Sequence, residues 1–274
     1  MYKKNSDVLT KCRLWLYSLA YIHLAVMSVK MLKIDFRSSA HPEVWVYQDI
    51  RFKLITCWFN LATLAYLPTS LYCEWRELHS QGNLSHVRVL NKMRNLCFTS
   101  ILLPVTIFSD LLFWRLWNKD RELVAPASVD ELAPFWTQHC MHTVSLVFVV
   151  LDLILCPRKI PKNFTLGLSL MFLFLGTYTS VCVHALSQGQ YVYPVIRTLS
   201  RHKLCLLVVY VFLEHYFYYL LQWRVIDILW SKGTSRNKSE NNNSILSYIP
   251  TCKLALNKII PILRLTKSAA NTQS

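Results

Sequence analysis

Residues 164–186 read FTLGLSLMFLFLGTYTSVCVHAL, an uninterrupted apolar run that contains no Asp, Glu, Lys or Arg. A helix needs about 20 mainly apolar residues to cross a bilayer, whereas buried strands are much shorter. Lipid offers no hydrogen bonds to peptide groups, so a run of this length must be helical to satisfy its own backbone. The run therefore predicts a transmembrane helix.

Five further runs of the same kind lie along the rest of the chain. They lie at 14–32, 54–73, 96–117, 139–157 and 204–230. Trp and Tyr residues gather near the ends of these runs, where amphipathic rings favour the headgroup region. Since the connections are short, we predict an all-α membrane protein with one six-transmembrane-helix bundle, formed by residues 1–230, and a separate tail.

The tail, residues 231–274, differs from the bundle in composition. Residues 232–244 are polar and rich in Asn and Ser, which is typical of a segment without a packed core. Residues 245–267 alternate apolar and basic side chains, and Pro250 and Pro261 interrupt them. Because proline breaks a helix, we expect this basic segment to lie on the membrane surface rather than to cross it.

The net charge of +15 is spread along the flanks of the apolar runs and is not gathered on a soluble domain. Attraction to anionic lipid headgroups explains this distribution, so no nucleic-acid partner is expected. Lys and Arg are more frequent at both termini and in the second and fourth loops, and cytosolic segments favour these residues. We predict cytosolic termini and an integral, multi-pass location in the endoplasmic reticulum, another endomembrane or the plasma membrane.

In this topology, several polar residues reach a similar depth at the non-cytosolic face. Thr56 lies at the start of the second run, His142 one turn into the fourth, and His184 near the end of the fifth. At a rise of about 1.5 Å per residue, Thr56 and His142 both lie roughly 5 Å below that surface. A threonine hydroxyl becomes an effective nucleophile when a neutral histidine takes its proton. The two residues are therefore candidates for nucleophilic acyl transfer.

Other interpretations of these residues remain open from the sequence. A threonine in a membrane helix usually bonds to a carbonyl one turn earlier, here that of Phe52. A histidine near the interface can simply pack or extend toward the headgroups. His139 and His142 are spaced to face one metal ion, but membrane hydroxylases use many more histidines. We therefore predict no metal and no cofactor.

Charged residues within the runs are expected to avoid lipid. A charge at the centre of a lone membrane helix costs at least about 2.5–3.5 kcal/mol on insertion scales. We therefore expect Asp110 and Glu214 to face the interior of the bundle. Asp152 lies close to the end of its run, and we expect it to pair with Arg158.

Four short segments, in chain order, carry a family resemblance. They are Phe52-Lys53-Leu54-Ile55-Thr56, Asp120-Arg121-Glu122, Trp136-Thr137-Gln138-His139-Cys140-Met141-His142-Thr143 and Tyr191-Val192-Tyr193-Pro194. On these segments, about residues 10–230 resemble the androgen-induced-gene and androgen-dependent tissue-factor-pathway-inhibitor-regulating protein family.

The resemblance implies a multi-pass hydrolase that cleaves fatty-acid esters of hydroxy fatty acids. By motif match, Thr56 is the nucleophile and His142, not His139, is its base. We expect Lys53, Arg121, His184 and Tyr193 to contact the substrate. Its carboxylate would stay at the interface, where Arg51, Lys53 or Arg121 could hold it. The alternative function is that of a non-catalytic membrane protein that binds lipid or regulates a protein partner.

Overall fold

The computed structural model describes residues 2–230, with side chains from Asp7 onward, and the tail predictions for 231–274 and 245–267 lie outside this range. The described chain is helical and contains no strand. Its α-helices are α1 (Tyr2–Lys33), α2 (Pro42–Ile50), α3 (Ile55–Leu78), α4 (Ser85–Cys97), α5 (Leu103–Lys119), α6 (Phe135–His142), α7 (Val144–Leu155), α8 (Thr165–Ser187), α9 (Pro194–Arg197) and α10 (Arg201–Trp230). Short helical turns are η1 (Phe36–Ser38), η2 (Arg51–Lys53), η3 (Phe98–Leu102), η4 (Arg121–Leu123) and η5 (Ala127–Glu131).

Five of the described helical segments are long and apolar enough to cross a membrane. They are Asp7–Lys33, Ser85–Lys119, Phe135–Leu155, Thr165–Ser187 and Arg201–Trp230. The pair Pro42–Lys53 and Ile55–Leu78, bent by 41°, adds a sixth if it forms one broken span. The all-helical, multi-pass architecture predicted from the apolar runs is thereby confirmed.

The segment Ser85–Lys119 lies at the centre of the bundle. It joins α4 and α5 through η3, which has the wider turn of a π-helix. Pro104 follows directly, and because it has no N–H it cannot donate to the carbonyl four residues earlier. The helix nevertheless continues to Lys119, and it carries Asp110 into the interior.

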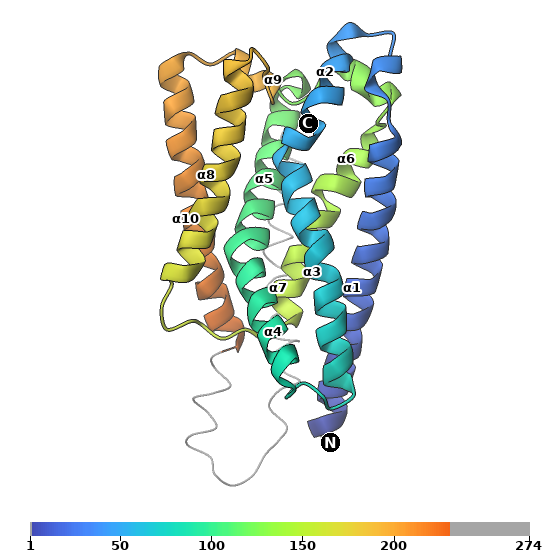
Figure 1. Cartoon of the computed structure of the whole chain (residues 1–274), viewed down its shortest axis with the longest axis vertical. Coiled ribbons are helices and arrows are strands. Elements are labelled where there is room, and N and C mark those ends of the chain that lie inside the picture. The colour runs from blue at the N-terminus through green and yellow to red at the C-terminus, as the bar shows by residue number, and fades with distance from the viewer. Residues whose placement is uncertain (1, 231–274) are drawn as a thin grey trace, which may run out of the picture.

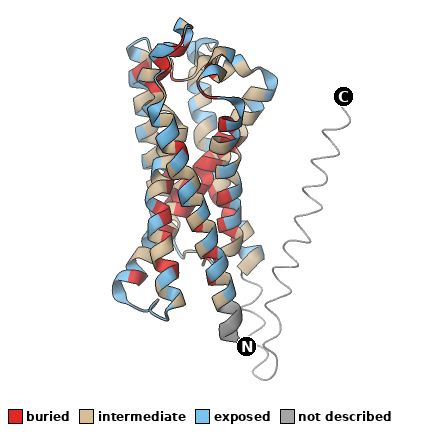
Figure 2. Cartoon of the chain, turned by 90° about the vertical axis from the view of Figure 1, so that its right-hand side faces the viewer, coloured by how far each residue is buried: buried red, intermediate tan, exposed pale blue. Residues whose placement is uncertain are grey.

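The main core forms where α1, α3, η3, α5 and α7 meet, and the inner faces of α8 and α10 contribute to it. Tyr17, Phe59, Leu102 and Phe148 are among its buried side chains. Figure 2 shows buried residues in the interior between the helices and exposed residues on their outer faces. The helices α8 and α10 lie side by side at one flank of the bundle (Figure 1) and expose most of their apolar side chains. Such faces suit contact with lipid tails.

A cap covers the end of the bundle that is at the top of Figure 1. We use the name cap for residues 34–53 and 121–133, which share a second hydrophobic core. Its buried members are Phe36, Val44, Tyr47, Ile50, Ala125, Val129 and Ala133. The two parts are also joined by polar contacts, because Ser128 Oγ donates to Glu43 Oε1 at 2.9 Å.

The intramembrane charges follow the sequence predictions with one exception. Asp110 is fully buried, and Arg158 Nη2 lies 2.8 Å from Asp152 Oδ2, as expected. Glu214 is only half-buried and lies beside Tyr210, close to Arg115. The prediction that Glu214 faces the interior is met only in part, because Glu214 has polar neighbours on α10 and α5 but is not enclosed as Asp110 is.

Candidate active site

A cavity of about 320 Å³ lies between the cap and the first halves of the spanning helices. Its walls are mainly apolar and come from α1, α3, α5, α6 and the cap. The polar and basic side chains that line it include Arg51, Thr56, Asn60, Gln138, His142 and Tyr193. No Asp or Glu is among its lining residues, so the cavity combines apolar walls with a positive local charge.

His142 is the last residue of α6 and is held by a buried carboxylate. Its Nδ1 lies 2.9 Å from Asp110 Oδ1. The other oxygen, Asp110 Oδ2, accepts a hydrogen bond of 2.6 Å from Ser145 Oγ. When Asp110 is ionised it can only accept, and in that state Nδ1 of His142 carries the proton and Nε2 is left as an acceptor. This is the protonation state that a general base needs.

The ring of Phe113 fixes the plane of the imidazole. It stacks on His142 with a centroid distance of 3.7 Å and an interplanar angle of 12°. Phe113 and His142 both line the cavity, whereas Asp110 lies behind them. The hydrogen bond and the stacking together leave the histidine little rotational freedom.

Thr56 is the second residue of α3 and lines the same cavity. Its hydroxyl makes no hydrogen bond with any described residue, and the Phe52 carbonyl instead accepts from Trp58 Nε1 at 3.0 Å. Hydroxyls deeper in the spans behave differently, since Thr63 and Thr177 each donate to the carbonyl four residues earlier at 2.8 Å. The Thr56 hydroxyl therefore remains available to a ligand in the cavity.

Tyr193 connects the loop before α9 to the first turn of α3. Its hydroxyl oxygen accepts a hydrogen bond of 2.9 Å from the backbone N–H of Ile55. It also lies 2.8 Å from the hydroxyl of Tyr178 on α8. The contacts place Tyr193 beside Thr56 at the cavity wall.

Three other residues predicted to contact substrate do not line the cavity. Lys53 Nζ donates to Gln190, and His184 is exposed on α8. Arg121 forms two hydrogen bonds to Asp130, at 2.7 and 2.9 Å, and these raise the pKa of its guanidinium. The structure thus brings together Thr56, His142 and Tyr193 and leaves the other three apart.

His139 and His142, which are three residues apart, have different surroundings. His139 is exposed, with Nδ1 3.1 Å from Thr143 Oγ1, and it packs against Trp114. It is not among the cavity residues, whereas His142 is. In the described part of the chain, no group of three or more His, Cys, Asp and Glu side chains is arranged to hold a metal ion.

One feature of the site, the partner of His142, was not apparent from the sequence, and the structure also selects Arg51 among the three residues that could hold the substrate carboxylate. Asp110 orients His142 from a position 32 residues away, and no motif spacing links the two. Arg51 lines the cavity, its Nη1 donates to the carbonyls of Leu32 and Ile34, and its buried Nε has no partner. The one available signal for Asp110 was an acidic residue within a membrane span.

Comparison with known proteins places this arrangement in a family. The family model described as FAR-17a/AIG1-like protein matches residues 17–225. The chain belongs to this family. The match covers every residue of the candidate site and confirms the resemblance drawn from the four sequence segments.

Curated relatives match over a shorter region. Androgen-dependent TFPI-regulating protein of Mesocricetus auratus is 35% identical over 115 residues, which are 42% of this chain and 49% of the relative. The protein of that name in Homo sapiens is 33% identical over 42% of this chain and 50% of the relative. Androgen-induced gene 1 protein of Homo sapiens is 31% identical over 41% of this chain and 49% of the relative. The chain thus spans about half the length of the curated relatives it matches, and no solved structure matches it.

Proposed function

We propose that this protein is a membrane lipid esterase that hydrolyses fatty-acid esters of hydroxy fatty acids. One observation carries the proposal: His142, bound through Nδ1 to buried Asp110, lines the same cavity as Thr56, whose hydroxyl makes no hydrogen bond with a described residue. A nucleophile, a base and a group that orients the base are the parts that nucleophilic acyl transfer requires.

The reaction proceeds in two steps. Thr56 Oγ attacks the ester carbonyl carbon while Nε2 of His142 takes its proton. The bond to the hydroxy fatty acid then breaks, and the imidazolium protonates the departing alkoxide. In the second step His142 takes a proton from water as the water oxygen bonds to the acyl carbon. The bond between that carbon and Thr56 Oγ then breaks, the imidazolium returns the proton to Thr56 Oγ, and the fatty acid leaves. The Asp110 carboxylate stabilises the imidazolium in both steps.

Arg51 is the residue we assign to the substrate carboxylate. It is the cavity-lining Arg, its Nε has no partner, and the described residues of the cavity wall supply no acid to neutralise it. Lys53 and Arg121 already have side-chain partners in Gln190 and Asp130. A substrate that carries both an ester and a carboxylate therefore finds complementary groups in one cavity.

We further propose that α3 is the sixth span, with α2 as its bent extension in the cap, and that both termini are cytosolic. The cavity then opens toward the non-cytosolic side of an endomembrane or the plasma membrane. Consensus glycosylation sites at Asn83, Asn163 and Asn242 all lie on the cytosolic side in this topology. All three should lack sugar in cells, and native glycan at Asn242 would reverse the assignment.

The function is tested by the purified protein in lipid nanodiscs with a fatty-acid ester of a hydroxy fatty acid. Thr56→Ala and His142→Ala should abolish hydrolysis, and Thr56→Ser should keep part of it because the hydroxyl remains. His139→Ala is the matched control, since His139 lies outside the cavity. Hydrolysis by Thr56→Ala at the wild-type rate would exclude the proposed mechanism.

A non-catalytic lipid-binding or partner-regulating function is the second candidate. The mainly apolar cavity favours it, since such walls also suit a lipid that is bound without turnover. This function predicts stoichiometric lipid retention by both wild type and Thr56→Ala. It also predicts that no ester is consumed by either protein.

A further inference from the structure

The hydroxyl of Tyr193 has an unusual set of partners at the cavity wall. A phenol supplies one donor and two acceptor positions. The N–H of Ile55 occupies one acceptor position at 2.9 Å, and the hydroxyl of Tyr178 lies 2.8 Å away. When Tyr178 donates, both acceptor positions of Tyr193 are filled, and the Tyr193 proton is free to point into the cavity.

The hydroxyl of Tyr193 lies close to the proposed nucleophile, Thr56, along the chain. Ile55, which donates to Tyr193, immediately precedes Thr56 in the first turn of α3. Burial raises the pKa of Tyr193 to about 12, so the phenol remains a donor throughout the physiological range. The backbone N–H of Thr56 also makes no hydrogen bond within the described chain, and it lies at the positive end of the helix dipole.

We propose that the Tyr193 hydroxyl is the oxyanion donor of this site and that Tyr178 is a positioning residue that directs its proton toward the cavity. The inference rests on the proposed esterase function. As Thr56 Oγ bonds to the carbonyl carbon, the π electrons of the ester move to its oxygen. That oxygen accepts a hydrogen bond from Tyr193, with the Thr56 N–H as a second donor, until the bond to the leaving alkoxide breaks.

The test compares Tyr193 with its neighbour Tyr178 on α8 and with Tyr191 of the same loop. Tyr193→Phe should lower kcat by about 10²–10³-fold, the usual effect of removing one oxyanion donor, with KM changed less than about twofold. Tyr178→Phe should lower kcat by a smaller factor, about 10-fold, because Tyr193 keeps its own hydroxyl. Tyr191→Phe is the matched control, since Tyr191 packs under Arg197 and does not line the cavity. Its kcat should equal that of the wild type.

A second readout separates an oxyanion donor from a structural role of Tyr193. A trifluoromethyl ketone of the acyl chain forms a charged adduct with a catalytic hydroxyl, whereas the corresponding ether does not. Tyr193→Phe should weaken binding of the ketone by about 100-fold and leave binding of the ether unchanged. Equal weakening of both, or a kcat within twofold of the wild type, overturns the inference.

The outcome for Thr56 distinguishes this inference from the function on which it rests. If Thr56→Ala is inactive while Tyr193→Phe is fully active, the esterase stands and the oxyanion assignment fails. If Thr56→Ala is as active as the wild type, both fail.

Discussion

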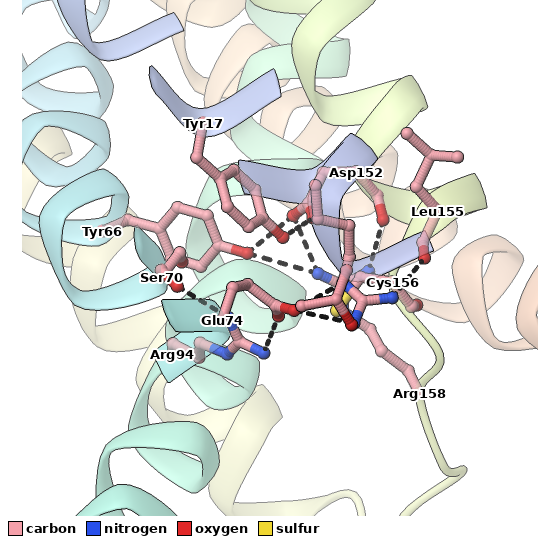
Figure 3. Close-up of polar contacts among 11 residues, drawn as sticks. Tyr17, Tyr66, Ser70, Glu74, Arg94, Asp152, Leu155, Cys156 and Arg158 are labelled. Atoms are coloured by element: carbon pink, nitrogen blue, oxygen red, sulfur yellow. Dashed lines mark hydrogen bonds and ion pairs between the residues drawn. The ribbon is translucent and has the colours of Figure 1, made fainter. Parts of the chain in front are cut away.

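Two polar clusters lie within the apolar bundle, and they are built differently. The first, which we call the dyad, consists of Asp110 and His142 beside the cavity. The second, which we call the charge cluster, lies nearer the end of the bundle that carries α4 (Figures 1 and 3). Its members are Arg13, Tyr17, Tyr66, Glu74, Arg94, Asp152 and Arg158.

In the charge cluster, each carboxylate is surrounded by several donors. Glu74 accepts from Arg13 at 2.7 Å and from Arg94 at 2.6 Å. Asp152 accepts from the hydroxyls of Tyr17 and Tyr66, and from Arg158, as Figure 3 shows. Its cations are arginines, which remain charged at all accessible pH values. None of its seven members lines the cavity, so the cluster serves to join α1, α3, α4 and α7.

The dyad has the opposite properties. The partner of its carboxylate is a histidine, a side chain that can both accept and donate a proton. One face of that histidine borders a cavity large enough for part of a lipid. The comparison teaches that a buried charge alone does not mark an active site. A titratable partner and access to a cavity are also required.

The largest effect is expected from a substitution that removes the negative charge of the dyad but keeps a side chain able to form its hydrogen bond. Asp110→Asn retains the shape of the side chain but can no longer stabilise an imidazolium. We expect kcat to fall by about 10³–10⁴-fold, as when the carboxylate of a hydrolase triad becomes an amide. The free energy of unfolding should change by less than about 1 kcal/mol. A variant with wild-type kcat would remove Asp110 from the account.

The same substitution in the charge cluster should act on stability instead. Asp152→Asn leaves Arg158 buried without its carboxylate, and breaking a buried pair costs about 3–5 kcal/mol. We expect a large loss of thermal stability in detergent, measured by fluorescence unfolding. The molecules that remain folded should hydrolyse ester with wild-type kcat. A selective loss of kcat with normal stability would show that this cluster also takes part in the reaction.

The sequence predicts the spans and the depths of residues in the membrane, but it does not predict which helix faces meet. The spans follow from the apolar runs, because lipid permits only helices there. The depths of Thr56, His142 and Tyr193 follow from topology, since each helix adds a known rise per residue. The rotation of each helix about its own axis, which decides where its side chains point, does not follow from the sequence. His184 has a similar depth but faces away from the cavity, and Asp110 meets His142 only because α5 packs against α6 and α7.

A smaller effect tests the charge inside the cavity. Arg51→Gln should raise KM about 10-fold for an ester that carries a free carboxylate, because a hydrogen bond to a charged group is worth about 1.5–3 kcal/mol. The methyl ester of the same substrate should show no change. Lys53→Gln is the control, since Lys53 lies two residues away but outside the cavity. Equal losses for both substrates would argue against a carboxylate contact.

The smallest expected effect concerns pH. Activity should fall toward acidic pH, because a protonated imidazole cannot accept the Thr56 proton. Burial raises the pKa of Tyr193 to about 12, so this donor stays protonated and no alkaline loss should occur below pH of about 10. Measurement of kcat against pH tests both the acidic loss and the absence of an alkaline loss. An alkaline loss that disappears in Tyr193→Phe would contradict this assignment.

The most direct test of the central claim is covalent labelling of the nucleophile. The purified protein in nanodiscs is treated with a fluorophosphonate that carries an acyl-like chain, and the modified peptide is identified by mass spectrometry. The account predicts one label on Thr56, absent from Thr56→Ala and strongly reduced in His142→Ala and Asp110→Asn. Undiminished labelling of Thr56→Ala, or a label confined to another residue, would contradict it.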